Sequence, residues 1–293
     1  MTTNRHGDEA PRLRVIQNCF LPNQQASCSF ESYLNHHTPT SGERYLFFET
    51  DVMARLVSEG WHRDSDYFGV LSHRFQRKLM ETQTWPLPLK NLNRETITCE
   101  AVESFLETKP EADLVYLARH IPHAVFQLGE SIHPGLMAAT KRMLECIGIN
   151  FDLSLRARCP IYFNSFVARS NFLERYVMDL LEPAMLAATE DSTLRTMLFT
   201  DSGYFKSFPA ELAAFYGINH YPLHAFIGER LINVYVMLSA ARVQPILRGN
   251  PNNLRGRALE ALRIKARLLQ WKLAPLERRL RPPQPLRPHE RHD

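Results

Sequence analysis

The 293-residue sequence lacks the short motifs that mark several large enzyme classes. It contains no GxGxxG, no Walker loop GxxxxGK[ST] and no GxSxG. These absences count against dinucleotide oxidoreductases, P-loop nucleotide hydrolases and α/β-hydrolases. The sequence also has no HExxH and no CxxC pair, and its five cysteines are scattered. A zinc site is therefore not expected.

Long apolar runs and a secretory signal are missing as well. No run approaches the roughly 18 uninterrupted apolar residues of a membrane span. The first residues, 1–11, are polar and lack the apolar centre of a signal peptide, so we expect them to be disordered. An odd number of cysteines without such a signal predicts free thiols in a reducing cytoplasm.

Positive charge is concentrated near the C-terminus. Residues 251–293 hold nine arginines and two lysines against four acidic residues, a net charge of +7, so the preceding 250 residues carry −3. Residues 253–281 have the pattern of a basic amphipathic helix that contains Trp271, and a Pro/Arg-rich tail, 282–293, follows. Such a helix suits an anionic membrane surface, and a helix packed on the domain with solvated arginines is the open alternative. Nucleic acid is not expected, because no binding module is recognisable and the body is acidic.

Segments with strand and helix patterns alternate along residues 12–250. The predicted strands and helices are, in order, strand 12–20, helix 43–60, strand 66–73, helix 99–108, strand 112–118, helix 133–146, strand 161–168, helix 171–189 and helix 221–238. This alternation predicts a three-layer α/β domain with a mostly parallel sheet. Because ligands bind beyond the carboxyl ends of such strands, we expect the segments after His73, Ala118 and Ala168 to surround one cleft.

The predicted helix 221–238 is apolar almost all round, yet it contains Glu229, Arg230 and Asn233. A buried carboxylate needs a partner or a function, because an unpaired buried charge is costly. Glu229 is therefore either a functional carboxylate or half of a structural ion pair with an arginine. His224 begins the same helix and is a candidate metal ligand or base, or a structural histidine.

Three further segments carry candidate chemistry. The DxD of Asp64-Ser65-Asp66 could hold a divalent cation, or could be a solvated turn, since it precedes a strand. The basic residues after the next strand, His73, Arg74, Arg77 and Lys78, could neutralise phosphate or form a solvated loop. The His133-Pro134-Gly135 start of a helix offers free N–H groups to an anion, or needs no ligand.

The order of these segments resembles a known family. The segments are, in order, Glu49-Thr50, which opens a helix, Asp66-Tyr67-Phe68-Gly69-Val70-Leu71-Ser72 followed by Phe75 and Lys78, then Gln127, Glu130 and His133-Pro134-Gly135, then Tyr162-Phe163-Asn164-Ser165-Phe166-Val167-Ala168, and finally Gly228-Glu229-Arg230-Leu231. In this order they are similar to segments of bacterial glycosyltransferase-like proteins from capsule and lipopolysaccharide gene clusters. The resemblance spans roughly residues 13–245. It implies a Rossmann-like fold of the GT-A type, with the basic helix following the glycosyltransferase domain.

The activity that the resemblance implies is transfer of a sugar from a nucleotide-sugar to a polysaccharide or lipid-linked acceptor. An enzyme of this kind is expected in the cytoplasm or on the inner face of the membrane. A non-catalytic binding or scaffold protein on the same fold is the alternative, and a different nucleotide-using transferase is a third reading.

Roles for individual residues follow from the resemblance. The acceptor base, or the residue that holds the acceptor, would be Glu229. The donor diphosphate would contact Asp66, His73, Arg74 and Lys78. The sugar or acceptor would contact Glu130, His133, Asn164 and Arg230. A Mn²⁺ or Mg²⁺ ion would be held by Asp64, Asp66 and His224, and metal dependence stays open because the DxD does not follow a strand.

Overall fold

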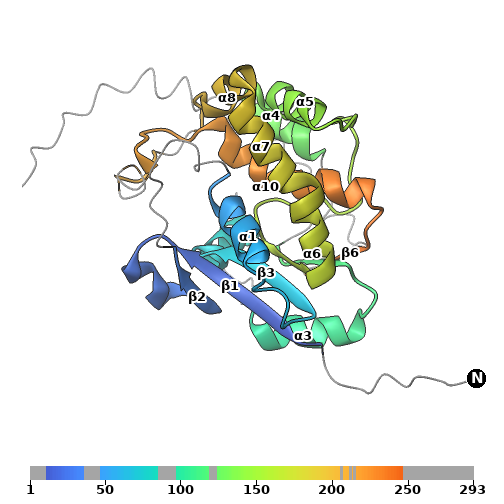
Figure 1. Cartoon of the computed structure of the whole chain (residues 1–293). Coiled ribbons are helices and arrows are strands. Elements are labelled where there is room, and N and C mark those ends of the chain that lie inside the picture. The colour runs from blue at the N-terminus through green and yellow to red at the C-terminus, as the bar shows by residue number, and fades with distance from the viewer. Residues whose placement is uncertain are drawn as a thin grey trace, which may run out of the picture.

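The polypeptide folds around one six-stranded sheet, in the order β2-β1-β3-β5-β4-β6 (Figure 1). A computed structural model describes residues 11–35, 47–84, 97–118, 124–204, 207–210, 213 and 216–246. The strands are β1 (Leu13–Cys19), β2 (Glu31–Leu34), β3 (Tyr67–Ser72), β4 (Leu114–Tyr116), β5 (Phe166–Arg169) and β6 (Val243–Pro245). The predicted α/β class with a mostly parallel sheet is confirmed.

One strand, β5, runs against the others. β1 pairs in parallel with β2 and β3, and β4 pairs in parallel with β6, whereas β5 is antiparallel to β3 and β4. The residues before β5 therefore lie beside the carboxyl ends of β3 and β4. Our prediction that the segment after Ala168 lines the cleft is wrong, because Ala168 pairs with Phe68 at the start of β3. Residues 161–165 lie at the cleft edge in its place.

Helices make up most of the remaining described chain. They are η1 (Pro22–Ser27), α1 (Glu49–Ser58), α2 (Phe75–Thr84), α3 (Cys99–Thr108), α4 (Val125–Ile132), α5 (Leu136–Cys146), α6 (Ser170–Tyr176), the π-helical segment η2 (Val177–Leu181), α7 (Glu182–Glu190), α8 (Ser192–Phe199) and α10 (Leu223–Leu238).

The sequence located some of these elements well and missed others. The helix predicted at 99–108 is α3, and the Thr98 hydroxyl caps it by accepting the N–H of Ala101 at 3.3 Å. The helix predicted at 171–189 is divided into α6, η2 and α7. η1, β2, α2, α4, α8 and β6 were not predicted. None of them is longer than ten residues, so a sequence window holds too few periodic positions to reveal them.

The long apolar helix α10 packs among other helices. It contacts α4, α5, α8 and η2, while α1 packs on β3 and α3 packs on β1. In the view of Figure 1, α1 lies above the strands and α3 below them. This packing explains why α10 is apolar almost all round.

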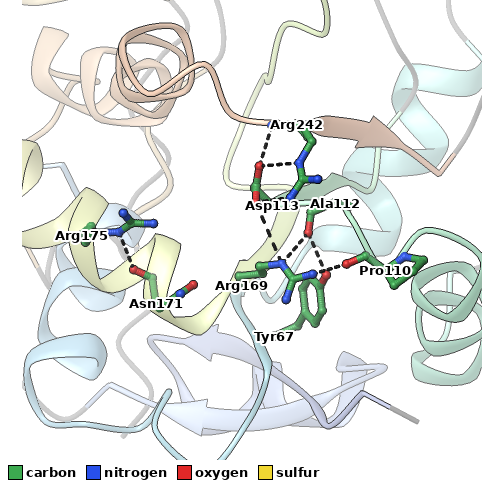
Figure 2. A network of polar contacts seen from close by, with 8 residues as sticks. All are labelled: Tyr67, Pro110, Ala112, Asp113, Arg169, Asn171, Arg175 and Arg242. Atoms are coloured by element: carbon green, nitrogen blue, oxygen red, sulfur yellow. Dashed lines mark hydrogen bonds and ion pairs between the residues drawn. The ribbon is translucent and has the colours of Figure 1, made fainter. Parts of the chain in front are cut away.

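The start of β4 is fastened by a polar cluster around Asp113 (Figure 2). The Asp113 carboxylate accepts the backbone N–H of Arg242 at 2.9 Å and its Nε–H at 3.2 Å, and Arg169 Nε lies 4.0 Å away. Arg169 also donates to the carbonyl oxygen of Ala112 and stacks over the ring of Tyr67. We call these residues the Asp113 cluster. It ties β3, β4, β5 and the segment before β6 together at the end of the sheet where β3 and β4 begin.

Several predictions concern segments outside the described residues. These are the disordered N-terminus, of which only Pro11 is described, the basic helix 253–281, the tail 282–293, and the loop after Ala118 at residues 119–123. Among the residues that the structure does describe, no helix has both the length and the apolar character that crossing a membrane requires.

Candidate functional site

A pocket of about 320 Å³ opens at the carboxyl ends of β1 and β3. One part of its wall is aromatic and is formed by Phe20, Phe47, Phe48, Phe163, Tyr204, Tyr216, Tyr221 and Phe226. The other part is polar and is formed by Glu49, Ser72, His73, Arg74, Arg77, Lys78 and Glu229. Five of the candidate residues from the sequence therefore meet in one cavity, namely His73, Arg74, Arg77, Lys78 and Glu229.

The cationic side of the pocket is built where β3 gives way to α2. β3 ends at Ser72, His73 and Arg74 follow, and α2 begins at Phe75. The basic segment is thus the entry and first turn of a helix and not a solvated loop. The N-terminus of a helix carries free N–H groups and partial positive charge, which add to the charge of Arg74 and Lys78. This corner of the pocket favours an anion.

A carboxylate that the sequence analysis did not single out, Glu49, lies at the same corner. Lys78 Nζ donates to Glu49 Oε2 at 3.2 Å, and the two side chains are only 26% and 15% exposed. Burial alone would raise the pKa of Glu49, but Lys78, the hydroxyl of Ser72 and His73 outweigh it and hold that pKa below its usual value. Glu49 is therefore an ionised partner that fixes the position of Lys78.

Glu229 is in the opposite situation. It lies in the middle of α10, partly buried, and makes no hydrogen bond or ion pair with any residue that the structure describes. Burial raises its pKa, with Glu49 adding to the effect, while Lys78 and Arg230 oppose it. The pKa values of the two pocket carboxylates are thus shifted in opposite directions, that of Glu49 downward and that of Glu229 upward. Such a difference is typical of sites where one carboxylate exchanges protons.

The backbone before Glu49 is strained. Phe47 and Phe48 have φ angles of 66° and 45°, which bulky residues rarely adopt. The Phe47 N–H donates to His224 Nδ1 at 3.1 Å, and a Cβ on Gly228 would lie 2.5 Å from the Cβ of Phe47. His224 and Gly228 of α10 therefore hold the turn that directs Glu49 into the pocket. Strain of this kind persists where the surrounding structure imposes it, often at functional sites.

Two buried polar side chains beside the pocket have no partner. Both ring nitrogens of His73 and both side-chain polar atoms of Asn18 lack a hydrogen bond. They are neighbours in the sheet, because Asn18 pairs with Ser72 and its carbonyl accepts the His73 N–H at 3.1 Å. Burial, with Arg74 and Lys78 adding to it and Glu49 opposing, lowers the pKa of His73 to about 4. His73 is thus neutral at pH 7 and lines the cavity as a hydrogen-bonding group.

The predicted anion site at His133-Pro134-Gly135 is filled by the chain itself. Glu130 accepts the backbone N–H of Gly135 at 2.9 Å and that of Met137 at 2.7 Å. Its carboxylate caps the N-terminus of α5. The structure therefore places Glu130 in a structural role, away from the sugar site predicted for it.

His133 and Arg230 lie behind the aromatic wall. The His133 ring stacks on Phe226 at 3.6 Å, and its Nδ1 lies 3.3 Å from the carbonyl oxygen of Ser202. Burial and the nearby Arg230 lower the pKa of His133 to about 3. Arg230 donates from Nη1 to the Phe226 carbonyl at 2.6 Å, and among the described residues it forms no ion pair with Glu229. Both residues support Phe226 and do not line the cavity.

The predicted amide site at Asn164 supports the fold around the pocket. Asn164 is buried and donates to the hydroxyl of Thr50 at 3.0 Å, which joins the segment before β5 to α1. On α10, the Asn233 amide both accepts from and donates to the backbone of Ile161, each at 2.8 Å. These two amides hold residues 161–165 at the cleft edge, with Phe163 in the pocket wall.

The three residues predicted to hold a metal do not form one site. Asp64 and Asp66 precede β3, whereas the pocket lies beyond its end, about 17 Å along a six-residue strand. The Asp66 carboxylate accepts the Arg12 N–H at 2.9 Å and pairs with the Arg12 side chain. The Nδ1 atom of His224 accepts the backbone N–H of Phe47, and burial lowers the pKa of His224 to about 3. Across the described ranges, no group of three or more His, Cys, Asp or Glu could hold a metal ion.

Glu49 and most of the aromatic wall were missed by sequence reasoning. Glu49 was recognised only as the residue that opens a helix. Its contact with Lys78 crosses 29 residues, and no local pattern signals it. The turn of Phe47 and Phe48 could have been suspected only from two adjacent bulky residues before a helix, which is a common arrangement.

Comparison of the chain with protein-family models, with curated proteins and with solved structures found no match.

Proposed function

We propose that the protein is a glycosyltransferase of the GT-A type that moves a sugar from a nucleotide-sugar to a polysaccharide or lipid-linked acceptor of a bacterial surface glycan. One observation carries the proposal. An unpartnered carboxylate, Glu229, shares a cavity with the cationic groups of Arg74 and Lys78 and with the N-terminus of α2. Sugar transfer from a diphosphate requires a carboxylate that takes the proton of the acceptor hydroxyl and positive charge that stabilises the departing diphosphate. This cavity contains both.

Glu229 acts as the base in this mechanism. An acceptor hydroxyl is a poor nucleophile, so a carboxylate within hydrogen-bond reach must take its proton as the new glycosidic bond forms. Glu229 is free to accept that proton because it has no other partner among the described residues, and its raised pKa favours holding it.

Arg74 and Lys78 act on the departing group. The bond between the sugar and the diphosphate breaks with its electron pair remaining on the diphosphate oxygen, so negative charge grows there. The guanidinium of Arg74, the ammonium of Lys78 and the N–H groups at the start of α2 stabilise this charge. Because Asp64, Asp66 and His224 do not form one site, no step is assigned to a metal held by them.

The aromatic wall serves the sugar or the acceptor. Sugar rings present C–H faces that pack on aromatic rings, and an aromatic wall excludes water, which would otherwise compete with the acceptor hydroxyl. His73, which lines the cavity, and Asn18, its neighbour in the sheet, have unpaired hydrogen-bonding atoms. A lipid-linked acceptor would also suit the proposed contact of residues 253–281 with an anionic membrane.

A non-catalytic protein that only binds an anionic ligand in this pocket is the second candidate. The placement of Asp64 and Asp66 at the start of β3 favours it, because the carboxylates expected beside the diphosphate lie at the far end of the strand. Both candidates predict ligand binding, and only the first predicts turnover.

The test is release of nucleoside diphosphate from nucleotide-sugars, with water or an added glycan as acceptor. The wild-type protein should release product from one donor class, and Glu229→Gln should lower the rate about 100-fold or more while the donor still binds. Glu130→Gln is the matched control, because it alters a carboxylate that caps α5 and leaves the pocket unchanged. Equal rates for wild type and Glu229→Gln would rule out Glu229 as the base, and binding without any turnover would favour the second candidate.

A further inference from the structure

Two cysteines lie in contact beside the pocket. Cys19 is the last residue of β1, and Cys28 directly follows η1, so the short helix η1 closes the nine-residue separation. Their Sγ atoms are 3.4 Å apart, Cys19 is fully buried and Cys28 is partly exposed. The other three thiols, Cys99, Cys146 and Cys159, have no comparable thiol neighbour among the described residues.

We propose that Cys19 and Cys28 form a reversible redox site, which hydroperoxides oxidise to an intramolecular disulfide. The sulfur atoms need to approach by only about 1.4 Å to reach the bonding distance of about 2.05 Å. Cys28 belongs to the segment that follows η1, whereas Cys19 is buried at the end of β1 and pairs with Leu34 of β2, so the movement falls mainly on Cys28. Oxidation of this pair does not require the proposed transfer reaction.

The reaction balances with hydrogen peroxide as oxidant. The Cys28 sulfur, which solvent can reach, attacks one peroxide oxygen, the O–O bond breaks, and the products are a sulfenic acid on Cys28 and one water. The Cys19 sulfur then attacks the Cys28 sulfur, and the S–S bond forms as the S–O bond breaks. The leaving hydroxide takes the Cys19 proton as a second water. Two thiols lose two electrons in total, and one peroxide gains them.

The position of the pair connects it to the pocket. Cys19 lies between Asn18, whose side chain has no hydrogen bond, and Phe20, which lines the cavity. The Phe20 ring meets Tyr216 of the aromatic wall edge-on at 5.6 Å. A disulfide would tie η1 to the end of β1 and so restrict the segment that carries Phe20.

The test follows the thiols directly. Native protein is treated with limiting hydrogen peroxide, denatured, alkylated with N-ethylmaleimide and digested with trypsin. Both cysteines fall on one tryptic peptide, residues 15–44, because no lysine or arginine occurs between Arg14 and Arg44. We expect this peptide to appear without alkylation and about 2 Da lighter than its reduced form, and dithiothreitol to restore two alkylation sites.

Two variants complete the experiment. In Cys28→Ser, the buried Cys19 should stay alkylatable after denaturation at the same peroxide dose, whereas Cys146→Ser, which removes an exposed thiol, should leave disulfide formation unchanged. The proposal is overturned if the wild-type peptide keeps two alkylated cysteines while Cys146 is oxidised. It is equally overturned if Cys28 passes to the sulfinic acid without forming the disulfide, or if the disulfide joins two chains.

Discussion

Two polar clusters lie at opposite ends of the sheet, and they differ in how completely their hydrogen bonds are satisfied. In the Asp113 cluster, the carboxylate accepts from Arg242, and Arg169 reaches both Asp113 and the Ala112 carbonyl (Figure 2). At the pocket, the ring nitrogens of His73 and the side-chain amide of the neighbouring Asn18 are buried without a hydrogen-bond partner. Glu229 also lines the pocket and forms no hydrogen bond or ion pair with the described residues. An unpaired buried polar group lowers the stability of the fold by about 1–3 kcal/mol. Several such groups in one place therefore favour a functional role over a structural one. The comparison indicates a structural role for the first cluster and supports the proposal that the second binds a ligand.

Replacement of Asp113 by alanine should produce the largest change in stability. Burial would raise the pKa of this carboxylate, but its hydrogen bonds from Arg242 and the charges of Arg242 and Arg169 lower it, so the ionised form is favoured in the fold. Asp113→Ala should lower the free energy of unfolding by about 2 kcal/mol, measured by urea denaturation. Asp152→Ala, in an exposed turn, is the control and should change it by less than about 0.5–1 kcal/mol. A smaller loss for Asp113→Ala than for the control would contradict the structural role.

Replacement of Lys78 by methionine should give a smaller and pH-dependent loss. Lys78 holds the pKa of Glu49 below its usual value, so this pair stabilises the fold above pH 4.5 and loses its effect as the pH falls through the lowered pKa. Lys78→Met should lower the free energy of unfolding by about 1–2 kcal/mol at pH 7. The difference in this free energy between the variant and the wild type should shrink towards pH 3. Urea denaturation at several pH values measures this. A difference that stays constant across the range would show that Glu49 and Lys78 are not coupled.

Replacement of Glu229 by glutamine should increase stability, whereas replacement of Lys78 should decrease it. The pKa of Glu229 is raised, so its ionised form opposes folding, and stability is lost as the pH rises above 4.5. Glu229→Gln should therefore be about 0.5–1 kcal/mol more stable than wild type at pH 7, and the gain should vanish below pH 4. Thermal unfolding across this range measures the gain. A loss of stability at pH 7 would mean that Glu229 is a structural carboxylate like Asp113.

Replacement of Arg74 by methionine should change stability least. Its side chain is exposed at the pocket rim, and surface substitutions usually stay within about 0.5 kcal/mol. Binding of an anionic ligand should nevertheless weaken, most clearly at low salt, because a charge next to the helix N-terminus is removed. Arg63→Met, which lies before β3 at the other end of the sheet, is the control for both measurements. Equal binding by the two variants would remove Arg74 from the site.

The sequence revealed the elements whose pattern is local. The strand after Asp66, the capped helix at Cys99 and the apolar helix around Glu229 each carry their own periodicity, and the structure contains all three. The reversed direction of β5 was not predicted, because strand direction depends on pairing partners and not on the residues within the strand. That direction places residues 161–165, with Phe163 in the pocket wall, at the cleft edge, and not the residues after Ala168.

In the candidate site, too, the sequence could place residues whose position follows from local pattern and could not place those that depend on distant contacts. Polar residues that follow a strand directly, such as His73 and Arg74, could be placed from topology alone. Glu130 could not, since its capping of α5 depends on a turn through Gly135 with a φ of 90°. Glu49 also could not, since its contact with Lys78 joins two separate helices.

The most direct test of the central claim is the thermal midpoint of the wild-type protein, Arg74→Met and Asp113→Ala with UDP, GDP, CMP and their sugars, each with and without Mn²⁺. A ligand that binds the native state raises the midpoint by mass action, even when no acceptor is known. We predict a rise with one nucleotide class for wild type and for Asp113→Ala, and a much smaller rise for Arg74→Met. No rise with any nucleotide in folded wild-type protein, or an equal rise in all three proteins, would contradict the assignment of this pocket to a nucleotide-sugar.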